Sequence, residues 1–132
     1  CEVARLAVGQ AAGFRITLLE AAEMVRRIAT GGIDMQGSAT NLAIIRRAMR
    51  LAVTSGTCKN VAVQGMDIAG KTGTPEAEGH TSERSAWFVG FAPFSKPEVV
   101  VVVFVNRGHG YDTAAPIAQR IFAAYFTKGG KP

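Results

Sequence analysis

Residues 99–105 constrain the fold more than any other part of this 132-residue chain, because they read Val-Val-Val-Val-Val-Phe-Val. Valine is β-branched, and such side chains favour an extended backbone. The stretch shows no alternation of apolar and polar residues, which is typical of a strand buried on both faces. We therefore expect a strand over residues 98–106, in a central position of a sheet. Seven apolar residues are too few to span a bilayer.

The residues before this stretch predict two further strands, over 66–74 and 85–91. A polar connection over 75–83 joins the first of them to the second. A short connection over 93–97, with a proline at each end, joins the second to the valine-rich strand. Short connections between neighbouring strands favour an antiparallel meander.

The residues before the strands predict two amphipathic helices. Thr17 and Glu20 have the spacing of a capping box, and Gly31 and Gly32 are expected to end the first helix. The second helix is expected over 40–54. The apolar residues that we expect to face the core at helical spacing are Leu18, Ala22, Val25 and Ala29 in the first helix and Leu42, Ile45, Met49 and Ala52 in the second.

A last helix is expected after the strands, with Thr113 as its cap and Pro116 tolerated in its first turn. Its expected buried face consists of Ile117, Ile121, Ala124 and Tyr125. This helix must fold back onto the sheet. The fold class that follows is α+β, an antiparallel sheet packed by helices. We expect one domain portion, with a helical segment over 1–60 and the strands and final helix over 61–132.

Composition excludes several classes of protein. With 48% hydrophobic and 19% charged residues, the chain is not of the disordered type. Its net charge of +5 would suit a polyanion, but the arginines lie in pairs on helical faces, so we expect no nucleic-acid partner. Cys1 and Cys58 form no disulfide framework and lack metal-ligand spacing, and whether they pair is left open. His80 and His109 are expected in glycine-containing loops. We expect no metal and no other cofactor.

Residues Gly65 to Thr72 match the phosphate-loop pattern G-x-x-x-x-G-K-[ST] in every fixed position. Such a loop needs a helix directly after its lysine, so that backbone N–H groups at the helix start face the phosphates. The residues at 73–79 include two glycines and a proline and show no apolar periodicity. Asp67, inside the pattern, would face phosphate unfavourably. Nucleotide binding through Gly65–Thr72 is the alternative that this pattern leaves open.

The same lysine has a different meaning if its segment is a strand. Lys71 places a positive charge, and the hydroxyls of Thr72 and Thr74 can bind a carboxylate. Gly73 lets another backbone approach closely, and an exposed strand edge lets an extended peptide add as a further strand. Strict alternation puts Lys71 and Thr72 on opposite faces, so a ligand would have to lie along the edge to meet both.

The segment Lys71-Thr72-Gly73-Thr74 resembles the K-T-G motif of penicillin-binding proteins and serine β-lactamases. It is followed by Ala-Trp-Phe-Val-Gly-Phe-Ala-Pro at 86–93 and then by the valine-rich stretch. Upstream, Ala-Val-Gly-Gln at 7–10 and Ala-Thr-Gly-Gly at 29–32 are similar to the helical segment that precedes the motif in that family. The whole succession resembles the C-terminal half of a penicillin-binding transpeptidase domain, which has a β-lactamase-like fold.

The resemblance implies a serine-type D,D-transpeptidase that cross-links peptidoglycan by acyl transfer from D-Ala-D-Ala stem peptides and is acylated by β-lactams. Lys71 would supply positive charge near the substrate carboxylate and a proton-shuttling serine. Thr72 and Thr74 would bind that carboxylate or the acyl-side amide, and the backbone N–H of Thr74 would be one of two oxyanion-hole donors. The resemblance also implies the outer face of the cytoplasmic membrane in the bacterial cell envelope, with the anchor outside this chain.

The sequence departs from the family in its nucleophile. The family uses a serine in S-x-x-K, and no serine of this chain has a lysine three residues later; the serines are Ser38, Ser55, Ser82, Ser85 and Ser95. The S-x-N element is missing too. We therefore expect 1–132 to be inactive alone. Its expected partner is the missing N-terminal half of the domain, cut away or present as a separate chain. A catalytically dead cell-wall-binding module is the other alternative.

Overall fold

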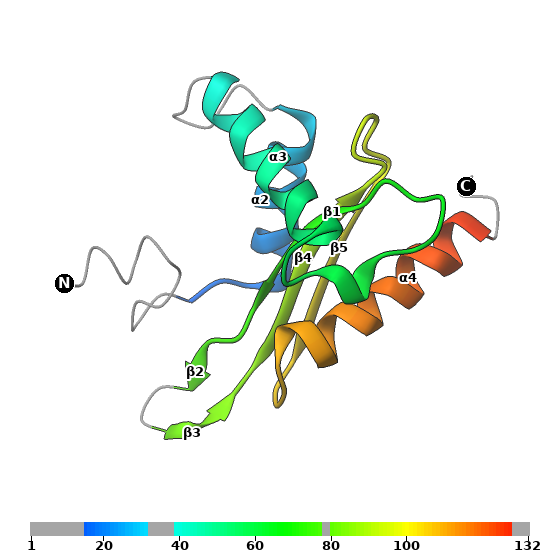
Figure 1. Cartoon of the computed structure of the whole chain (residues 1–132). Coiled ribbons are helices and arrows are strands. Elements are labelled where there is room, and N and C mark those ends of the chain that lie inside the picture. The colour runs from blue at the N-terminus through cyan, green and yellow to red at the C-terminus, as the bar shows by residue number, and fades with distance from the viewer. Residues whose placement is uncertain (1–14, 32–38, 78–79, 128–132) are drawn as a thin grey trace.

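The computed structural model describes residues 15–31, 39–77 and 80–127 (Figure 1). The expected features of the first fourteen residues, including Cys1 and any pairing it makes, lie outside these ranges. The described elements, in chain order, are α2 (Leu18–Thr30), α3 (Ala39–Thr54), the 3₁₀ turn η1 (Lys59–Val61), β1 (Ala69–Gly73), β2 (Glu76–Ala77), β3 (His80–Arg84), β4 (Ala86–Ala92), β5 (Val99–Val105), the π-helical turn η2 (Gly110–Ala114) and α4 (Ala115–Thr127).

Three strands form an antiparallel sheet in the order β1-β4-β5. Lys71 lies opposite Val89 on β4, and Val89 in turn lies opposite Val102 on β5. The expected meander and the α+β class are confirmed. The residues between β1 and β4, expected to be only a polar connection, form a separate two-stranded ribbon of β2 and β3. His80 therefore lies in a strand and not in a loop.

The valine-rich strand β5 is an edge strand among the described residues, and β4 is the central one. The prediction of a central position was wrong for this part of the chain. The valine-rich composition of β5 indicates that both of its faces are covered, but it does not indicate how many strands pair with it. The faces are covered: Val101 and Val103 are buried in one core cluster, and Val100 packs against the other.

The two core clusters lie on opposite faces of the sheet. On one face, Phe122 of α4 meets Phe88 of β4 edge to face, with ring centroids 6.3 Å apart. On the other face, Val25 of α2 and Met49 of α3 pack around Phe91. In Figure 1, α4 runs beside the sheet, and α2 and α3 gather toward one end of it. The molecule therefore has three layers, with a helix layer on either side of the sheet.

Helix ends follow the sequence closely. Thr17 and Glu20 make both bonds of the capping box, and α2 ends at Gly31, which has φ of 72°. Pro116 lies in the first turn of α4, as expected. Thr113 does not cap that helix directly, because η2 comes before it. No helix within the described ranges is both long enough and apolar enough to cross a membrane.

The buried helix faces were only partly predicted. Each helix carries apolar residues on more than one side, so periodicity alone did not define the face that packs. The largest difference is in α4, where Ala118 and Phe122 are buried while Ile117 and Ile121 are exposed. The residues buried within the three helices are Ala21, Val25, Ile28 and Ala29 in α2, Leu42, Met49 and Val53 in α3, and Ala115, Ala118 and Phe122 in α4.

Candidate functional site

Strand β1 carries Lys71, Thr72 and Gly73, and Thr74 follows it directly. One edge of β1 pairs with β4, and the other has no strand partner among the described residues. Gly70 of β1 lies opposite Gly90 of β4. An added Cβ would lie 2.5 Å from the Phe88 ring at Gly70 and 2.6 Å from it at Gly90. The two glycines thus make room for the ring that anchors β1 to the core.

Lys71 and Thr72 lie on opposite faces of β1, as alternation predicts. Lys71 is exposed, and its ammonium donates to the carbonyl of Thr72. Thr72 is only 7% exposed. Its hydroxyl donates to Thr57 Oγ1 at 3.1 Å and accepts from the free, buried thiol of Cys58 at 3.8 Å. The structure therefore brings the charged group to the surface and holds the first hydroxyl of the motif inside.

Thr74 contacts a segment far along the chain. Its Oγ1 accepts a hydrogen bond of 3.0 Å from the backbone N–H of Gly110, the first residue of η2. An added Cβ at Gly110 would lie 2.6 Å from the carbonyl oxygen of Gly73 and 2.8 Å from that of Trp87. The sequence placed His109 in a glycine-containing loop and gave Gly110 no role, so this contact was missed. The glycine at the start of η2 was the local signal for it.

The start of β1 is held by α3 and by the turn between β4 and β5. Arg50 of α3 forms an ion pair of 2.5 Å with Asp67 and donates to the carbonyl of Ile68 at 3.0 Å. The carbonyl of Asp67 accepts a hydrogen bond of 2.6 Å from the N–H of Phe94. Arg46 donates to the carbonyl of Phe94 at 2.7 Å and lies over its ring, 5.3 Å from the centroid. Arg46 and Arg50 of α3 thus fix the start of β1 and the turn that contacts it.

The phosphate-loop interpretation is not supported. Lys71 lies in the middle of a strand, and the next element along the chain is the short strand β2, where a phosphate loop requires a helix. Asp67, within the pattern, is paired with Arg50. The backbone N–H groups of this segment therefore do not converge at the start of a helix.

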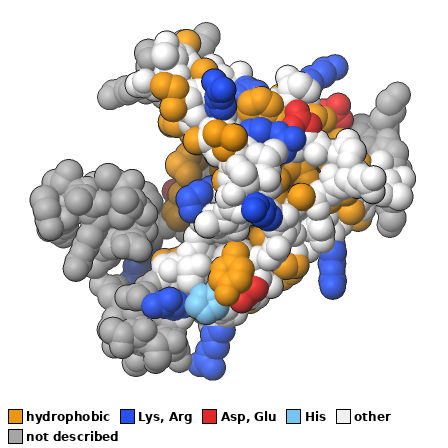
Figure 2. All heavy atoms as spheres, in the orientation of Figure 1, with side chains coloured by type: hydrophobic (Ala, Val, Ile, Leu, Met, Phe, Trp, Pro, Cys, Tyr) orange, Lys and Arg blue, Asp and Glu red, His pale blue; other side chains and the backbone are white. Residues whose placement is uncertain are grey.

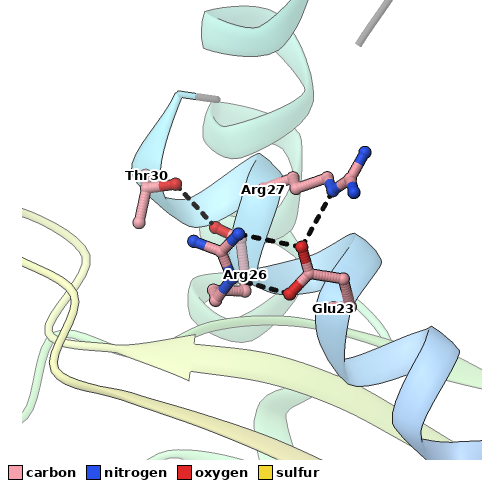
Figure 3. A network of polar contacts seen from close by, with 4 residues as sticks. All are labelled: Glu23, Arg26, Arg27 and Thr30. Carbon is pink, nitrogen blue, oxygen red and sulfur yellow. Dashed lines mark hydrogen bonds and ion pairs between the residues drawn. The ribbon is translucent and has the colours of Figure 1, made fainter. Parts of the chain in front are cut away.

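Among the described residues, the largest shift of a side-chain pKa is that of Glu23 on the surface of α2, whose arginine contacts are drawn in Figure 3. The guanidinium groups of Arg26 and Arg27 donate to the carboxylate of Glu23 and lower its pKa from 4.5 to about 2. The capping bonds from Thr17 likewise lower the pKa of Glu20. Both carboxylates make these bonds within α2 and its N-cap. Within the described ranges, no three His, Cys, Asp or Glu residues are grouped so that they could hold a metal.

A family model for the penicillin-binding protein transpeptidase domain matches residues 2–125. The chain belongs to this family. It fits the C-terminal part of the domain. The peptidoglycan D,D-transpeptidase MrdA of Acinetobacter baumannii is 33% identical over 111 residues, which are 74% of this chain and 16% of that protein.

Solved structures of the family agree with this fold. Penicillin-binding protein 2 of Pseudomonas aeruginosa, in complex with WCK 5153, superposes with a TM-score of 0.79 at 26% identity, over 94% of this chain and 32% of the other. Penicillin-binding protein A of M. tuberculosis, an imipenem acyl-enzyme complex, gives a TM-score of 0.69 at 29% identity, over 84% of this chain and 31% of the other. The transpeptidase-family chain spans less than a fifth of the length of the curated relatives first matched, between 14% and 18%.

Proposed function

We propose that this chain forms one wall of the active site of a peptidoglycan D,D-transpeptidase that acts on D-Ala-D-Ala stem peptides and is acylated by β-lactams. The observation that carries the proposal is the edge of β1 that has no strand partner among the described residues; it presents an exposed lysine and is followed directly by a threonine within a K-T-G sequence. An extended peptide can add to such an edge through backbone hydrogen bonds. A stem peptide ends in a carboxylate, for which Lys71 and the threonine hydroxyls are suitable partners.

Each residue of the motif has a proposed role in the acyl transfer. Lys71 supplies positive charge near the substrate carboxylate and the proton-shuttling serine. Thr72 and Thr74 bind the carboxylate or the acyl-side amide, and Gly73 lets the substrate backbone approach. The backbone N–H of Thr74 is one of the two donors to the oxyanion, a kind of interaction whose loss typically slows an enzyme about 100- to 1,000-fold.

The chain needs a second part to react, because it contains no S-x-x-K serine. We propose that the N-terminal part of the same domain supplies this nucleophile and packs against the present chain. Two features fit such a partner: β5 has no strand on its outer edge within the described residues, and several large apolar side chains are exposed. The most exposed of these are Leu19, Ile44 and Leu51, and apolar side chains interrupt the polar surface in Figure 2.

The domain division and location follow from the same proposal. Residues 1–60 form the helical portion and 61–132 the motif strand, the meander and the last helix of a single transpeptidase domain. The reaction takes place in the bacterial cell envelope, at the outer face of the cytoplasmic membrane, where peptidoglycan is assembled. The membrane anchor belongs to another part of the protein.

Denaturing mass spectrometry with and without a penicillin tests the proposal. It is applied to the full-length protein and to 1–132 alone. We expect a covalent adduct on the full-length protein, at a serine outside 1–132, and no adduct on the isolated chain. Stem-peptide binding by a full-length protein that never gains the mass of the drug would contradict the enzyme and indicate a binding module. An adduct on 1–132 itself would contradict the assignment of the nucleophile to another part.

A further inference from the structure

The two hydroxyls of the K-T-G segment differ in burial and in hydrogen-bond partners. A threonine hydroxyl has one proton to donate and two lone pairs to accept with. A carboxylate only accepts, so it can be bound only by a hydroxyl whose proton is free. The hydrogen bonds that Thr72 and Thr74 already make within the protein therefore decide which of them is ready for a carboxylate.

The hydroxyl of Thr72 is enclosed by protein groups. Thr72 Oγ1 lies 3.1 Å from Thr57 Oγ1, and the thiol of Cys58 donates to it over 3.8 Å. The side chain is also almost fully buried. A ligand therefore reaches this hydroxyl only if these contacts open.

The proton of Thr74 is free. Its oxygen accepts from the backbone N–H of Gly110 at 3.0 Å, and no acceptor for its proton lies among the described residues. The donor occupies one lone pair, so the O–H bond must point away from Gly110. The side chain is half-buried at the end of β1, where solvent or a ligand can reach it.

We propose that Gly110 is a positioning residue of the active site: its N–H holds the Thr74 hydroxyl with its proton directed at the carboxylate of the substrate or β-lactam. The inference rests on the proposed function and deepens it, because it names the backbone group that orients the Thr74 hydroxyl. Glycine is required at 110, since a Cβ would lie within 3 Å of backbone atoms of both Gly73 and Trp87. A larger residue would push η2 away from β1 and break the bond to Thr74.

Acylation of the full-length protein by a penicillin and by its methyl ester tests the proposal, because the ester lacks the carboxylate. The measured quantity is the ratio of the two acylation rate constants. Loss of one hydrogen bond to a charged group lowers such a ratio about tenfold. We expect this loss in Thr74→Val and in Gly110→Ala, and recovery in Thr74→Ser. In the Thr74→Val background, Gly110→Ala is expected to lower the ratio no further.

Gly108→Ala is the matched control. Gly108 has φ of 140°, and a Cβ there would meet the side chain of Thr113, so this variant strains the same loop without touching β1. We expect it to lower the melting temperature and leave the ratio unchanged. If Gly110→Ala lowers both acylation rates equally, or lowers the ratio equally with valine at 74, the positioning role is wrong.

A second measurement needs no change at Gly110 and so applies even if Gly110→Ala does not fold. Site-resolved amide hydrogen exchange should be faster at Gly110 in Thr74→Val than in the natural protein, with the neighbouring amides of η2 unchanged. Equal exchange at Gly110 in both proteins would overturn the inference. A natural protein that neither penicillin nor its ester acylates would instead refute the proposed function, and the inference with it.

Discussion

The two outer edges of the sheet differ in length, composition and charge. The β1 edge has five residues, two of them glycines, and carries the exposed Lys71. The β5 edge has seven residues, all apolar. A long apolar edge without a partner tends to pair with another strand and stay paired, whereas a short edge bearing a lysine resists such pairing. The β1 edge is thus suited to a ligand that binds reversibly, and the β5 edge is suited to a strand that stays paired.

The largest loss of stability should come from removing the core side chain of β4, the strand that pairs with both β1 and β5. Phe88 of β4 is fully buried between the two glycines and Phe122. We expect Phe88→Ala to lower the free energy of unfolding by about 3–5 kcal/mol, through lost burial and a cavity. Denaturant unfolding measures this. Phe104→Ala, at a side chain that is 42% exposed, is the control and should cost far less. Equal losses would mean that the core is not where the structure has it.

The next largest effect should separate ligand binding at the β1 edge from stability. Lys71 is exposed, so Lys71→Ala is expected to leave the melting temperature of the full-length protein unchanged. Removal of its charge should slow acylation by a penicillin about 100-fold, in the range typical of groups that assist proton transfer. Lys96→Ala, in the exposed turn before β5, removes the same charge elsewhere. Equal acylation rates in Lys71→Ala and Lys96→Ala would remove Lys71 from the site.

A smaller effect, on self-association, should show whether the β5 edge pairs with another strand. We expect isolated 1–132 to self-associate through this edge, as measured by sedimentation. A lysine on an edge strand opposes such pairing. Phe104→Lys should therefore raise the dissociation constant about tenfold, equivalent to roughly 1.4 kcal/mol. Ile121→Lys adds the same charge to the exposed side of α4 and should leave association unchanged. If both variants weaken it equally, the contact is not at β5.

The smallest effect lies on α2, away from both edges. The pKa of Glu23 is about 2 in the folded chain and 4.5 without its partners, so its contribution to stability is complete above pH 4.5 and is lost as the pH falls through 2. Glu23→Gln should flatten this small part of the acid-unfolding curve. Glu98→Gln, at an exposed carboxylate before β5, is the control. A curve unchanged by Glu23→Gln would mean that solvent screens the arginine pairs completely.

Features that depend on neighbouring residues could be predicted from the sequence. The capping box at Thr17, the three strands and the opposite orientation of Lys71 and Thr72 all follow from spacing within a few residues. The resemblance of residues 71–74 to the K-T-G motif led to the family, because that succession of residues is specific.

Features that depend on contacts between distant segments could not be predicted. Gly110 and Thr74 are 36 residues apart, and nothing in the local sequence links them. The buried face of α4 was mispredicted because Ile117 and Phe122 are both apolar, and only the shape of the sheet surface selects Phe122. Whether β5 is a central or an edge strand depends on which strands pair with it, and the residues of β5 do not determine how many do.

The Phe88 ring above Gly70 and Gly90 has a consequence for natural variation. A methyl group at either glycine would collide with the ring, so neither glycine can gain a side chain beside Phe88. Homologues should therefore show covariation between 70 and 88, with alanine at 70 accompanied by a smaller side chain at 88. Position 90 should stay glycine, because a Cβ there would also lie 2.6 Å from the carbonyl oxygen of Ala69. Packing among these three residues thus constrains the register of β1 against β4 and, with it, the position of Lys71 along the strand.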